Sequence, residues 1–431
     1  MILTDDQRAD TLDVMPHVRR ELGGKGVTFP DAVVVNPLCC PSRATILTGR
    51  YSHATGVYAN VPPHGGFEAF DDSSTIATAL QGAGYRTALI GKYLNGYSRA
   101  QAGVVPPGWD RWFATTGDAY YGFGVSDQGA LGFAGLDEAS YSTTFLTDAA
   151  LRFIRETDPS QPFFLYLAFH APHFPSRPAP RDAEAFSGLP PFRPASYDEP
   201  DVSDKPGWVR NQPPLTTAAR REIDEVRRDM LRTLLEVDRS VKRIVDQLGR
   251  DGRIRDTLIV FSSDNGYLWG EHRLKGKSAA YEESIGVPLV VRFDAVVQAA
   301  RTDRHLVSNI DFAPTFADAA GIDPPDADGA SLMALLRDAD APWREDVLIE
   351  HTHGVGGSAD EIDPPTYCAV RSTRHLLVAY ETGDEELYDL TRDPQQLDNR
   401  VADAAMTRVL RGLRERLRDL CNPPPPGFSV P

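Results

Sequence analysis

Residues Pro37 to Arg50 read PLCCPSRATILTGR, and this stretch decides how the rest of the chain is interpreted. Cys39, Cys40 and Pro41 come just before an apolar run that Gly49 closes, which predicts a loop leading into a short helix. The backbone N–H groups and the positive end of the helix dipole would face the cysteines and favour an anion there. Taken alone, the pattern fits a proline-bounded helix start with small buried cysteines as well.

The size and composition of the chain are those of a folded protein. Its 431 residues can bury a large core, and they favour two or three domains or one large α/β domain with an appendage. A hydrophobic content of 41% and a charged content of 25% are ordinary for globular proteins.

The chain is strongly acidic, with a formal net charge of −16 and a pI near 5.1. Phosphate backbones are bound by clustered lysine and arginine, so we expect no nucleic-acid partner. A small sulfated or phosphorylated substrate would need a local group of basic side chains to overcome the unfavourable overall field.

Four cysteines are too few for a disulfide scaffold. A bond between the adjacent Cys39 and Cys40, a bond between Cys368 and Cys421, and free thiols all stay open. The sequence has no apolar run of membrane-spanning length, and Met1 leads directly into acidic residues rather than a signal peptide. As written, the chain is expected to be cytoplasmic, with no membrane partner, or exported if its N-terminus is truncated.

Apolar runs that end in polar residues alternate with helical patterns over the first 340 residues. The predicted strands are 2–6, 33–35, 85–92, 162–169, 258–266, 287–292 and 305–310. The predicted helices are 10–22, 74–83, 141–156 and 216–248. This alternation predicts an α/β fold in which helices flank a large, mostly parallel mixed sheet.

Three other regions lack this alternation of apolar runs and helical patterns. Residues 97–140 predict surface loops and short hairpins, and the proline-dense residues 172–214 predict a long structured excursion that forms a binding rim. Asp311 is expected to cap the helix that follows it. After residue 340, short strands and a helix over 401–420 predict a smaller antiparallel sheet with a helix on it. We therefore expect a catalytic α/β domain at 1–340 and a C-terminal α+β subdomain at 341–431.

Two predicted strands end in oxygen-bearing side chains, Asp5 with Asp6 and Asp264 with Asn265. Open α/β sheets bind ligands at the carboxyl ends of their strands, and hard divalent cations prefer carboxylate and amide oxygens. Each pair alone is ordinary for a strand end or cap. Together they predict a site for one divalent cation.

The run from Cys39 to Arg43 resembles the Cys-x-Pro-Ser-Arg signature of the type I sulfatases, and the following Leu47 to Arg50 is similar to the same family. The resemblance extends over nearly the whole chain and implies an alkaline-phosphatase-like fold. It also implies that a formylglycine-generating enzyme oxidises Cys39 to formylglycine, whose aldehyde hydrate is the nucleophile.

The same resemblance implies a role for each remaining site residue. The implied ligands of Ca²⁺, with Mg²⁺ as the alternative, are Asp5, Asp6, Asp264, Asn265 and the modified Cys39. Lys92 and Lys277 correspond to sulfate-binding lysines, and Arg43 holds the nucleophile in orientation. His173 matches the histidine that protonates the leaving alcohol and contacts substrate, with His170 as the competing candidate.

One motif departs from the common pattern. Many sulfatases have Lys-x-His where this chain has Lys92, Tyr93, Leu94 and Asn95, as in the subset resembling N-acetylglucosamine-6-sulfatases. Asn95 is then expected to bind substrate, but an amide is no base. The step that expels sulfate is left without an assigned base.

The expected activity is hydrolysis of a sulfate monoester, with a sulfated sugar as substrate because of the resemblance to that subset. The main alternative is a phosphonate monoester or phosphodiester hydrolase of the same superfamily. A non-catalytic protein that binds a sulfated glycan through an unmodified Cys39 is the alternative from another class.

Overall fold

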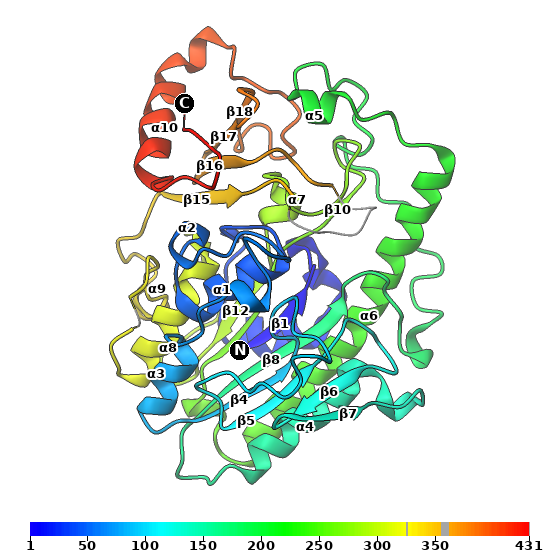
Figure 1. The fold of residues 1–431 in the computed structure, drawn as a ribbon, viewed down its shortest axis with the longest axis vertical. Helices are drawn as coiled ribbons and strands as arrows, with labels where there is room; N and C mark the ends of the chain where they lie inside the picture. Colours follow the sequence, from blue (N-terminus) through cyan, green and yellow to red (C-terminus); the bar gives the residue numbers. More distant parts are fainter. Residues whose placement is uncertain (325, 355–361, 431) are drawn as a thin grey trace.

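A computed structural model describes residues 1–324, 326–354 and 362–430. A ten-stranded mixed sheet runs through the larger part of the molecule in the order β13-β2-β12-β9-β1-β8-β4-β5-β6-β7 (Figure 1). Its strands are β1 Ile2–Asp5, β2 Val27–Thr28, β4 Arg86–Gly91, β5 Arg111–Thr115, β6 Gly124–Asp127, β7 Ala130–Phe133, β8 Phe163–Pro172, β9 Ile259–Ser263, β12 Leu289–Arg292 and β13 Arg301–Thr302.

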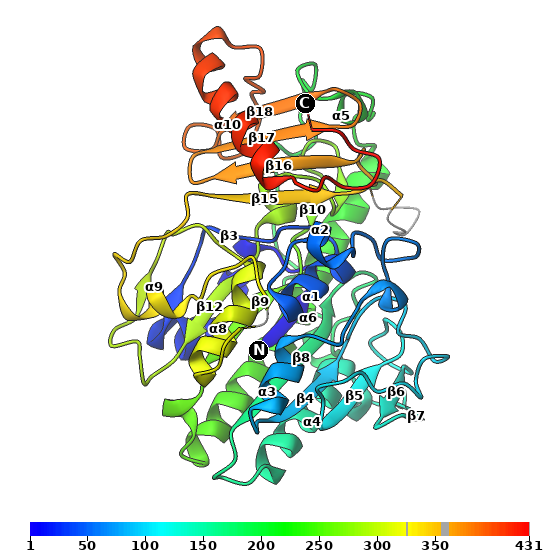
Figure 2. The same cartoon turned by 60° about the vertical axis from the view of Figure 1, so that its left-hand side comes forward.

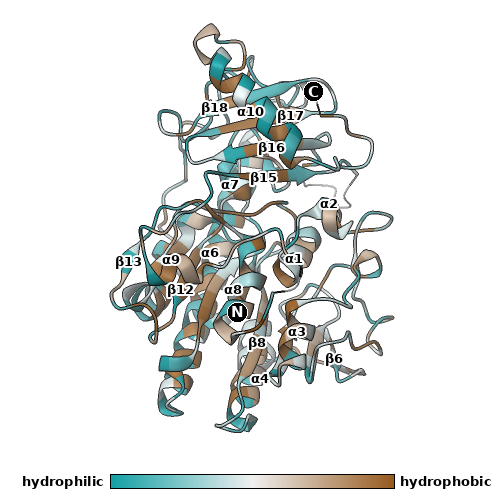
Figure 3. Cartoon of the chain, turned by 90° about the vertical axis from the view of Figure 1, so that its left-hand side faces the viewer, coloured by the Kyte–Doolittle hydropathy of each residue, from teal (hydrophilic) through white to brown (hydrophobic). Residues whose placement is uncertain are grey.

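The five strands in the middle, β9, β1, β8, β4 and β5, are parallel to one another, whereas the flanking strands β12 and β6 pair with them in the antiparallel sense. Side chains alternate between the two faces of these strands, as the pleat requires. In β8, Tyr166 and Ala168 pack into one core, whereas Leu165 and Leu167 pack into the other. Apolar residues therefore dominate the central strands, and hydrophobic colours run through the interior of the larger part of the molecule in Figure 3.

Helices cover both faces of the sheet. On one face lie α4 (Ser142–Glu156) and α6 (Thr217–Arg250), and on the other α1 (Cys39–Thr48), α3 (Ile76–Gly82) and α8 (Phe312–Ala320). Shorter elements complete the fold: the helices α2 Ser52–Thr55, α5 Gly207–Arg210, α7 Glu282–Ile285 and α9 Met333–Arg337, and the strand pairs β3 Ala32–Val33 with β14 Val307–Ser308 and β10 Leu268–Trp269 with β11 Lys275–Gly276.

The C-terminal part is a four-stranded antiparallel sheet with one long helix on it (Figure 2). Its elements are β15 Asp346–His351, β16 Tyr367–Ser372, β17 His375–Tyr380, β18 Glu385–Asp389 and α10 Thr407–Leu420. A disulfide joins Cys368 on β16 to Cys421 after α10, whereas Cys39 and Cys40 are free. The predicted fold class is confirmed. The boundary at residue 340 stays a prediction.

The predicted helix over 10–22 is wrong as a continuous element. The chain forms a 3₁₀-helix at Ala9–Val14 and a separate π-helical stretch at Val18–Leu22. Pro16 lies between them and has no backbone N–H to continue a helical ladder. Asp238 on α6 accepts hydrogen bonds from the backbone N–H groups of His17 and Val18, at the start of the second stretch.

The prediction of surface loops over 97–140 is wrong in part. The hairpin of β6 and β7 was expected, but β5 continues the parallel part of the main sheet beside β4. Trp112 on β5 is completely buried and packs edge-on against Tyr93 and Tyr97. Frequent glycine, proline and aromatic residues had concealed this strand in the sequence.

The predicted strand over 305–310 is reduced to the two residues of β14, and a 3₁₀-turn follows it. Asp311 stands at the N-cap position of α8, as predicted, but its side chain makes no capping hydrogen bond there. Its carboxylate accepts hydrogen bonds from the backbone N–H groups of Ser308 and Ala330 and pairs with Arg344. In the parts of the chain that the structure describes, no helix is both long and apolar enough to span a membrane.

Candidate active site

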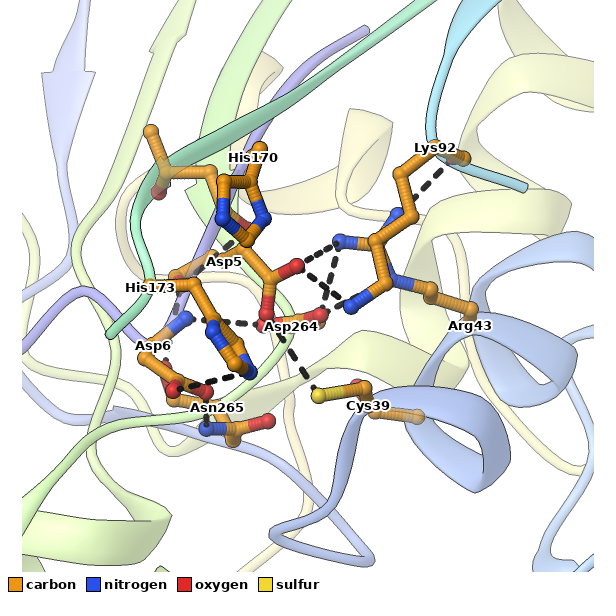
Figure 4. A network of polar contacts seen from close by, with 12 residues as sticks. Asp5, Asp6, Cys39, Arg43, Lys92, His170, His173, Asp264 and Asn265 are labelled. Carbon is orange, nitrogen blue, oxygen red and sulfur yellow. Dashed lines mark hydrogen bonds and ion pairs between the residues drawn. The ribbon is translucent and has the colours of Figure 1, made fainter. Parts of the chain in front are cut away.

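The residues predicted to carry chemistry meet where the parallel strands end (Figure 4). Asp5 ends β1 and Asp6 follows it, and Asp264 and Asn265 follow β9. The site residues on the neighbouring strands are His170 and His173 at the end of β8 and Lys92 directly after β4. Because these strands are adjacent and parallel, their carboxyl ends place distant parts of the sequence at one sheet edge.

Two local irregularities of the backbone orient the side chains of Asp5 and Asp6. The register between β1 and β8 shifts between Leu3 and Asp5, so the regular pairing of the two strands is interrupted at the end of β1. Asp6 has φ 67°, a left-handed conformation that is uncommon for a residue with a side chain. Its backbone N–H donates to Oδ1 of Asp264 at 3.1 Å, so the strained residue is tied to the neighbouring strand.

Cys39 is the first residue of α1 and is completely buried. Its Sγ donates to Oδ1 of Asp5 at 3.4 Å and accepts from Nζ of Lys277 at 2.9 Å. The predicted loop and helix are therefore present, with the side chain at the helix N-terminus. Burial and the Asp5 carboxylate raise the pKa of the Cys39 thiol well above its ordinary value, more than Lys277 lowers it. A thiol of this kind is a poor nucleophile at neutral pH.

Arg43, one turn further along α1, is completely buried among the carboxylates. It pairs with Oδ2 of Asp264 at 2.8 Å and with Oδ2 of Asp5 at 3.4 Å, and it donates to the backbone carbonyl of Lys92 at 2.9 Å. The guanidinium therefore connects α1 to the ends of three strands.

The two predicted sulfate-binding lysines both reach the acidic pair. Nζ of Lys92 lies 2.6 Å from Oδ2 of Asp5, and Nζ of Lys277 lies 2.6 Å from Oδ1 of Asp6. Burial alone opposes ionisation of Asp5, but Lys92 and the other nearby cations outweigh it and hold the pKa of Asp5 well below its usual range. Burial and the Asp5 charge raise the pKa of Asp264 to about 6.

The donor set fits a hard cation. Within the described residues, the buried atoms Oδ2 of Asp6 and Oδ1 of Asn265 accept no hydrogen bond, although Nδ2 of Asn265 donates to Oδ1 of Asp6 at 2.7 Å. Unpartnered buried oxygens are costly unless a ligand uses them. Ligand atoms of Asp5, Asp6, Cys39 and His173 also lie within 4.8 Å of one another. The oxygens of Asp264 face Arg43 and the Asp6 backbone instead.

His170, near the end of β8, and His173, directly after it, differ in their surroundings. Nε2 of His173 lies 3.7 Å from Oδ2 of Asp6, and its side chain is partly exposed. His170 is 5% exposed, and neither ring nitrogen has a hydrogen-bond partner among the described residues. Burial lowers the pKa of His170 to about 4, so its ring is neutral at physiological pH. Of the two, His173 is the one grouped with Cys39 and the acidic pair.

Asn95 lies three residues beyond Lys92 and lines the same small cavity. Its backbone carbonyl accepts from the N–H of Phe67 at 2.6 Å, and its side-chain oxygen is buried without a partner in the described chain. Asp118, which follows β5, also lines this cavity. Asp118 was absent from the predicted site because β5 was not recognised as part of the sheet.

The C-terminal sheet makes hydrogen bonds to both loops that carry site residues. The sequence did not predict these hydrogen bonds. The Tyr367 hydroxyl donates to the carbonyl of Ser278, next to Lys277, at 2.8 Å. The backbone N–H of Glu350 donates to the carbonyl of Val35, ahead of the cysteine loop, at 2.8 Å. Hydroxyl hydrogen bonds to distant backbone have no signature in a sequence, so this contact needs the folded structure.

Comparison with known proteins identifies the class. A family model described as Sulfatase matches residues 1–322, and a model described as N-sulphoglucosamine sulphohydrolase, C-terminal, matches residues 270–422. The chain therefore belongs to the sulfatase family and is a sulfuric ester hydrolase.

Among its relatives, the human N-acetylglucosamine-6-sulfatase is 34% identical over 93% of this chain and 80% of that protein. A solved structure in complex with its substrate D-glucosamine-2-N,6-O-disulfate is 25% identical, with a TM-score of 0.84 over 98% of this chain and 97% of that one. The phosphonate monoester hydrolase of Agrobacterium radiobacter shares the fold, with a TM-score of 0.78 at 24% identity over 98% of this chain and 94% of that one.

We expect Arg43→Ala to lower the free energy of unfolding by about 3–5 kcal/mol, because it leaves the buried carboxylates of Asp5 and Asp264 without their shared cation. Urea-induced unfolding measures the change. The matched control is Arg416→Ala, which removes an exposed pair with Asp346 and should cost less than about 1 kcal/mol. Equal losses in both variants would contradict the role given to Arg43.

Proposed function

We propose that this sulfatase hydrolyses the sulfate ester of a sulfated amino sugar of the N-acetylglucosamine 6-sulfate type. The observation that carries the proposal is the single buried cluster in which Cys39 touches both Asp5 and Lys277. The names of the human relative and of the ligand in the similar solved structure support this choice of sugar.

We propose that a formylglycine-generating enzyme converts Cys39 into the nucleophile. In support, Cys39 itself is held as a protonated thiol by burial and by Asp5, so the unmodified side chain is unsuited to attack. Arg43 contacts both Asp5 and Asp264 and is the candidate for fixing the orientation of residue 39. When present, the formylglycine hydrate supplies a hydroxyl that attacks sulfur.

The proposed cation is Ca²⁺, with Mg²⁺ as the alternative, held by Asp5, Asp6, Asp264, Asn265 and residue 39. The unpartnered oxygens of Asp6 and Asn265 support it, as does the attraction of this cluster for the ammonium groups of Lys92 and Lys277. When bound, such a cation polarises a sulfate oxygen.

The remaining roles are part of the same proposal. Lys92 and Lys277 are proposed to bind the other sulfate oxygens, where negative charge accumulates in the transition state. His173 is proposed to donate a proton to the leaving oxygen, and its partial exposure and position beside Asp6 support this role. Asn95 is proposed to donate a hydrogen bond to substrate, because its amide cannot act as a base.

The modification is tested by mass analysis of the peptide that contains Cys39, from protein made together with a formylglycine-generating enzyme. We expect an aldehyde in place of the thiol at Cys39, no conversion in Cys39→Ala, and full conversion in the control Cys40→Ala. An intact Cys39 thiol under these conditions would favour the non-catalytic glycan-binding alternative.

Removal of divalent metal should reduce stability. Adding Ca²⁺ at about 100 times its Kd to metal-stripped protein should stabilise the fold by about 2.7 kcal/mol, because only the folded chain assembles the donor set. Thermal unfolding with and without Ca²⁺ measures this shift. Asp6→Asn should abolish it, and the control Asp148→Asn, at an exposed pair with Arg243, should retain it. A shift that survives Asp6→Asn would place the ion elsewhere.

The substrate class is tested by comparing kcat/KM for N-acetylglucosamine 6-sulfate and an aryl phosphonate monoester. We expect the sulfate ester to be preferred by about 10-fold or more, a difference of about 1.4 kcal/mol in transition-state binding. A preference for the phosphonate would replace the proposal by the phosphonate hydrolase alternative.

A further inference from the structure

The carboxylate of Asp118 lies at the edge of the site, on the side of Lys92. It comes three residues after β5 ends, so the same sheet edge that gathers the other site residues positions it. Its Oδ1 lies 3.7 Å from Nζ of Lys92 and 3.7 Å from Nδ1 of His170, while its side chain is 42% exposed. The carboxylate therefore has one side toward the buried cluster and one side toward solvent.

Asp118 is a second carboxylate beside Lys92, in addition to Asp5, and it adds to the negative charge around this lysine. Nζ of Lys92 already lies 2.6 Å from Asp5, which is the closer partner by more than 1 Å. A second negative charge beside this lysine also opposes the binding of an anion, because like charges repel strongly where water is partly excluded. Asp118 thus weakens the attraction of Lys92 for sulfate. Contacts between Asp118 and another part of the substrate would offset this loss.

The space beside Asp118 is built from polar groups that lack partners. A cavity of about 140 Å³ is lined by Lys92, Asn95, Thr116 and Asp118, among others, and this volume far exceeds the roughly 15 Å³ that one ordered water needs. The side-chain oxygens of Asn95 and Thr116 are buried and have no hydrogen-bond partner in the described chain. Next to Asp118, the deeply buried His170 also has both ring nitrogens unpartnered in that part of the chain.

Unpartnered buried polar atoms in a native protein indicate a missing ligand or water. The Asn95 side-chain oxygen is an acceptor, and the Thr116 hydroxyl can accept as well as donate. The solvent-facing side of the Asp118 carboxylate adds a further acceptor, so a ligand group that donates hydrogen bonds is complementary to this side of the cavity. Burial opposes ionisation of Asp118, but Lys92 and His170 outweigh it and lower its pKa to about 2. Asp118 is therefore an acceptor throughout the physiological range.

We propose that Asp118 is a specificity residue that accepts hydrogen bonds from a hydroxyl or ammonium group of the sugar that carries the sulfate. The cavity between Asn95, Thr116 and Asp118 would then receive this part of the sugar while Lys92 binds the sulfate. The inference rests on the proposed function, because it assigns the sugar end of the same site. Simple sulfate esters without such donors gain nothing from Asp118 and meet only its repulsion.

The test measures binding by calorimetry, in the presence of Ca²⁺, to protein whose Cys39 is left unmodified, so that no turnover occurs. The probes are inorganic sulfate and the 6-sulfates of glucosamine, N-acetylglucosamine and glucose. Asp118→Ala should weaken the Kd of a sugar sulfate about 10-fold or more, the range of a hydrogen bond to a charged group, and should tighten the Kd of inorganic sulfate. Asp118→Asn, which keeps one acceptor oxygen, should lose less and serves if the alanine variant does not fold.

The matched control is Asp127→Ala, since Asp127 is 49% exposed, pairs with Arg111 and lies on β6. It should leave every Kd unchanged. Loss for glucosamine 6-sulfate alone would identify an ammonium donor, and equal loss for all three sugars would identify a hydroxyl.

Two outcomes would overturn the inference. One is an Asp118→Ala effect that is the same for inorganic sulfate and for sugar sulfates, which would mean that Asp118 only positions Lys92. The other is wild-type protein that binds none of the three sugar sulfates. A protein that binds them through Asp118 but never hydrolyses them after maturation would instead refute the proposed function and leave this inference standing.

Discussion

The parallel order of β9, β1, β8, β4 and β5 is the constraint on which the rest of the structure depends. Parallel strands present all their carboxyl ends at one edge, so residues separated by more than 250 positions become neighbours without any local sequence relationship. Because both faces of these strands are buried under helices, their register is fixed by packing. The polar tips of five strands are held in place by the same apolar contacts that stabilise the fold.

Because the strand ends converge, several buried carboxylates lie close together, and this is unfavourable unless cations lie beside them. Asp5, Asp6 and Asp264 are completely buried, and each is balanced by Arg43, Lys92 or Lys277. Buried charges are tolerated only when paired, so removing any one partner disturbs the others. The basic side chains compensate the buried negative charge of the carboxylates, and in the proposed function Lys92 and Lys277 also supply the positive charge that a sulfate needs.

Much of this was predictable from sequence because it depends on local patterns. The polar tips of β1, β4, β8 and β9 follow clear apolar runs, and the cysteine motif marks the helix start. Asp118 was missed since its strand, β5, lacks such a run, and the tie between Tyr367 and Ser278 was missed because it joins distant segments. The break at Pro16 was available in the sequence, but the apolar spacing of residues 10–22 outweighed it.

The net charge of −16 bears on how such a site selects an anion. The overall field repels a sulfate ester, so long-range steering does not favour its approach, and recognition must come from contacts made within the desolvated site. Only two of the six lysines lie in the cluster, and both already pair with carboxylates. A free sulfate ion therefore competes for occupied cations. If Asp118 and its neighbours accept hydrogen bonds from the sugar, as we propose, a sulfate ester gains contacts that a free sulfate ion lacks. This difference would give an acidic protein a physical basis for preferring the ester over inorganic sulfate, the product it must release.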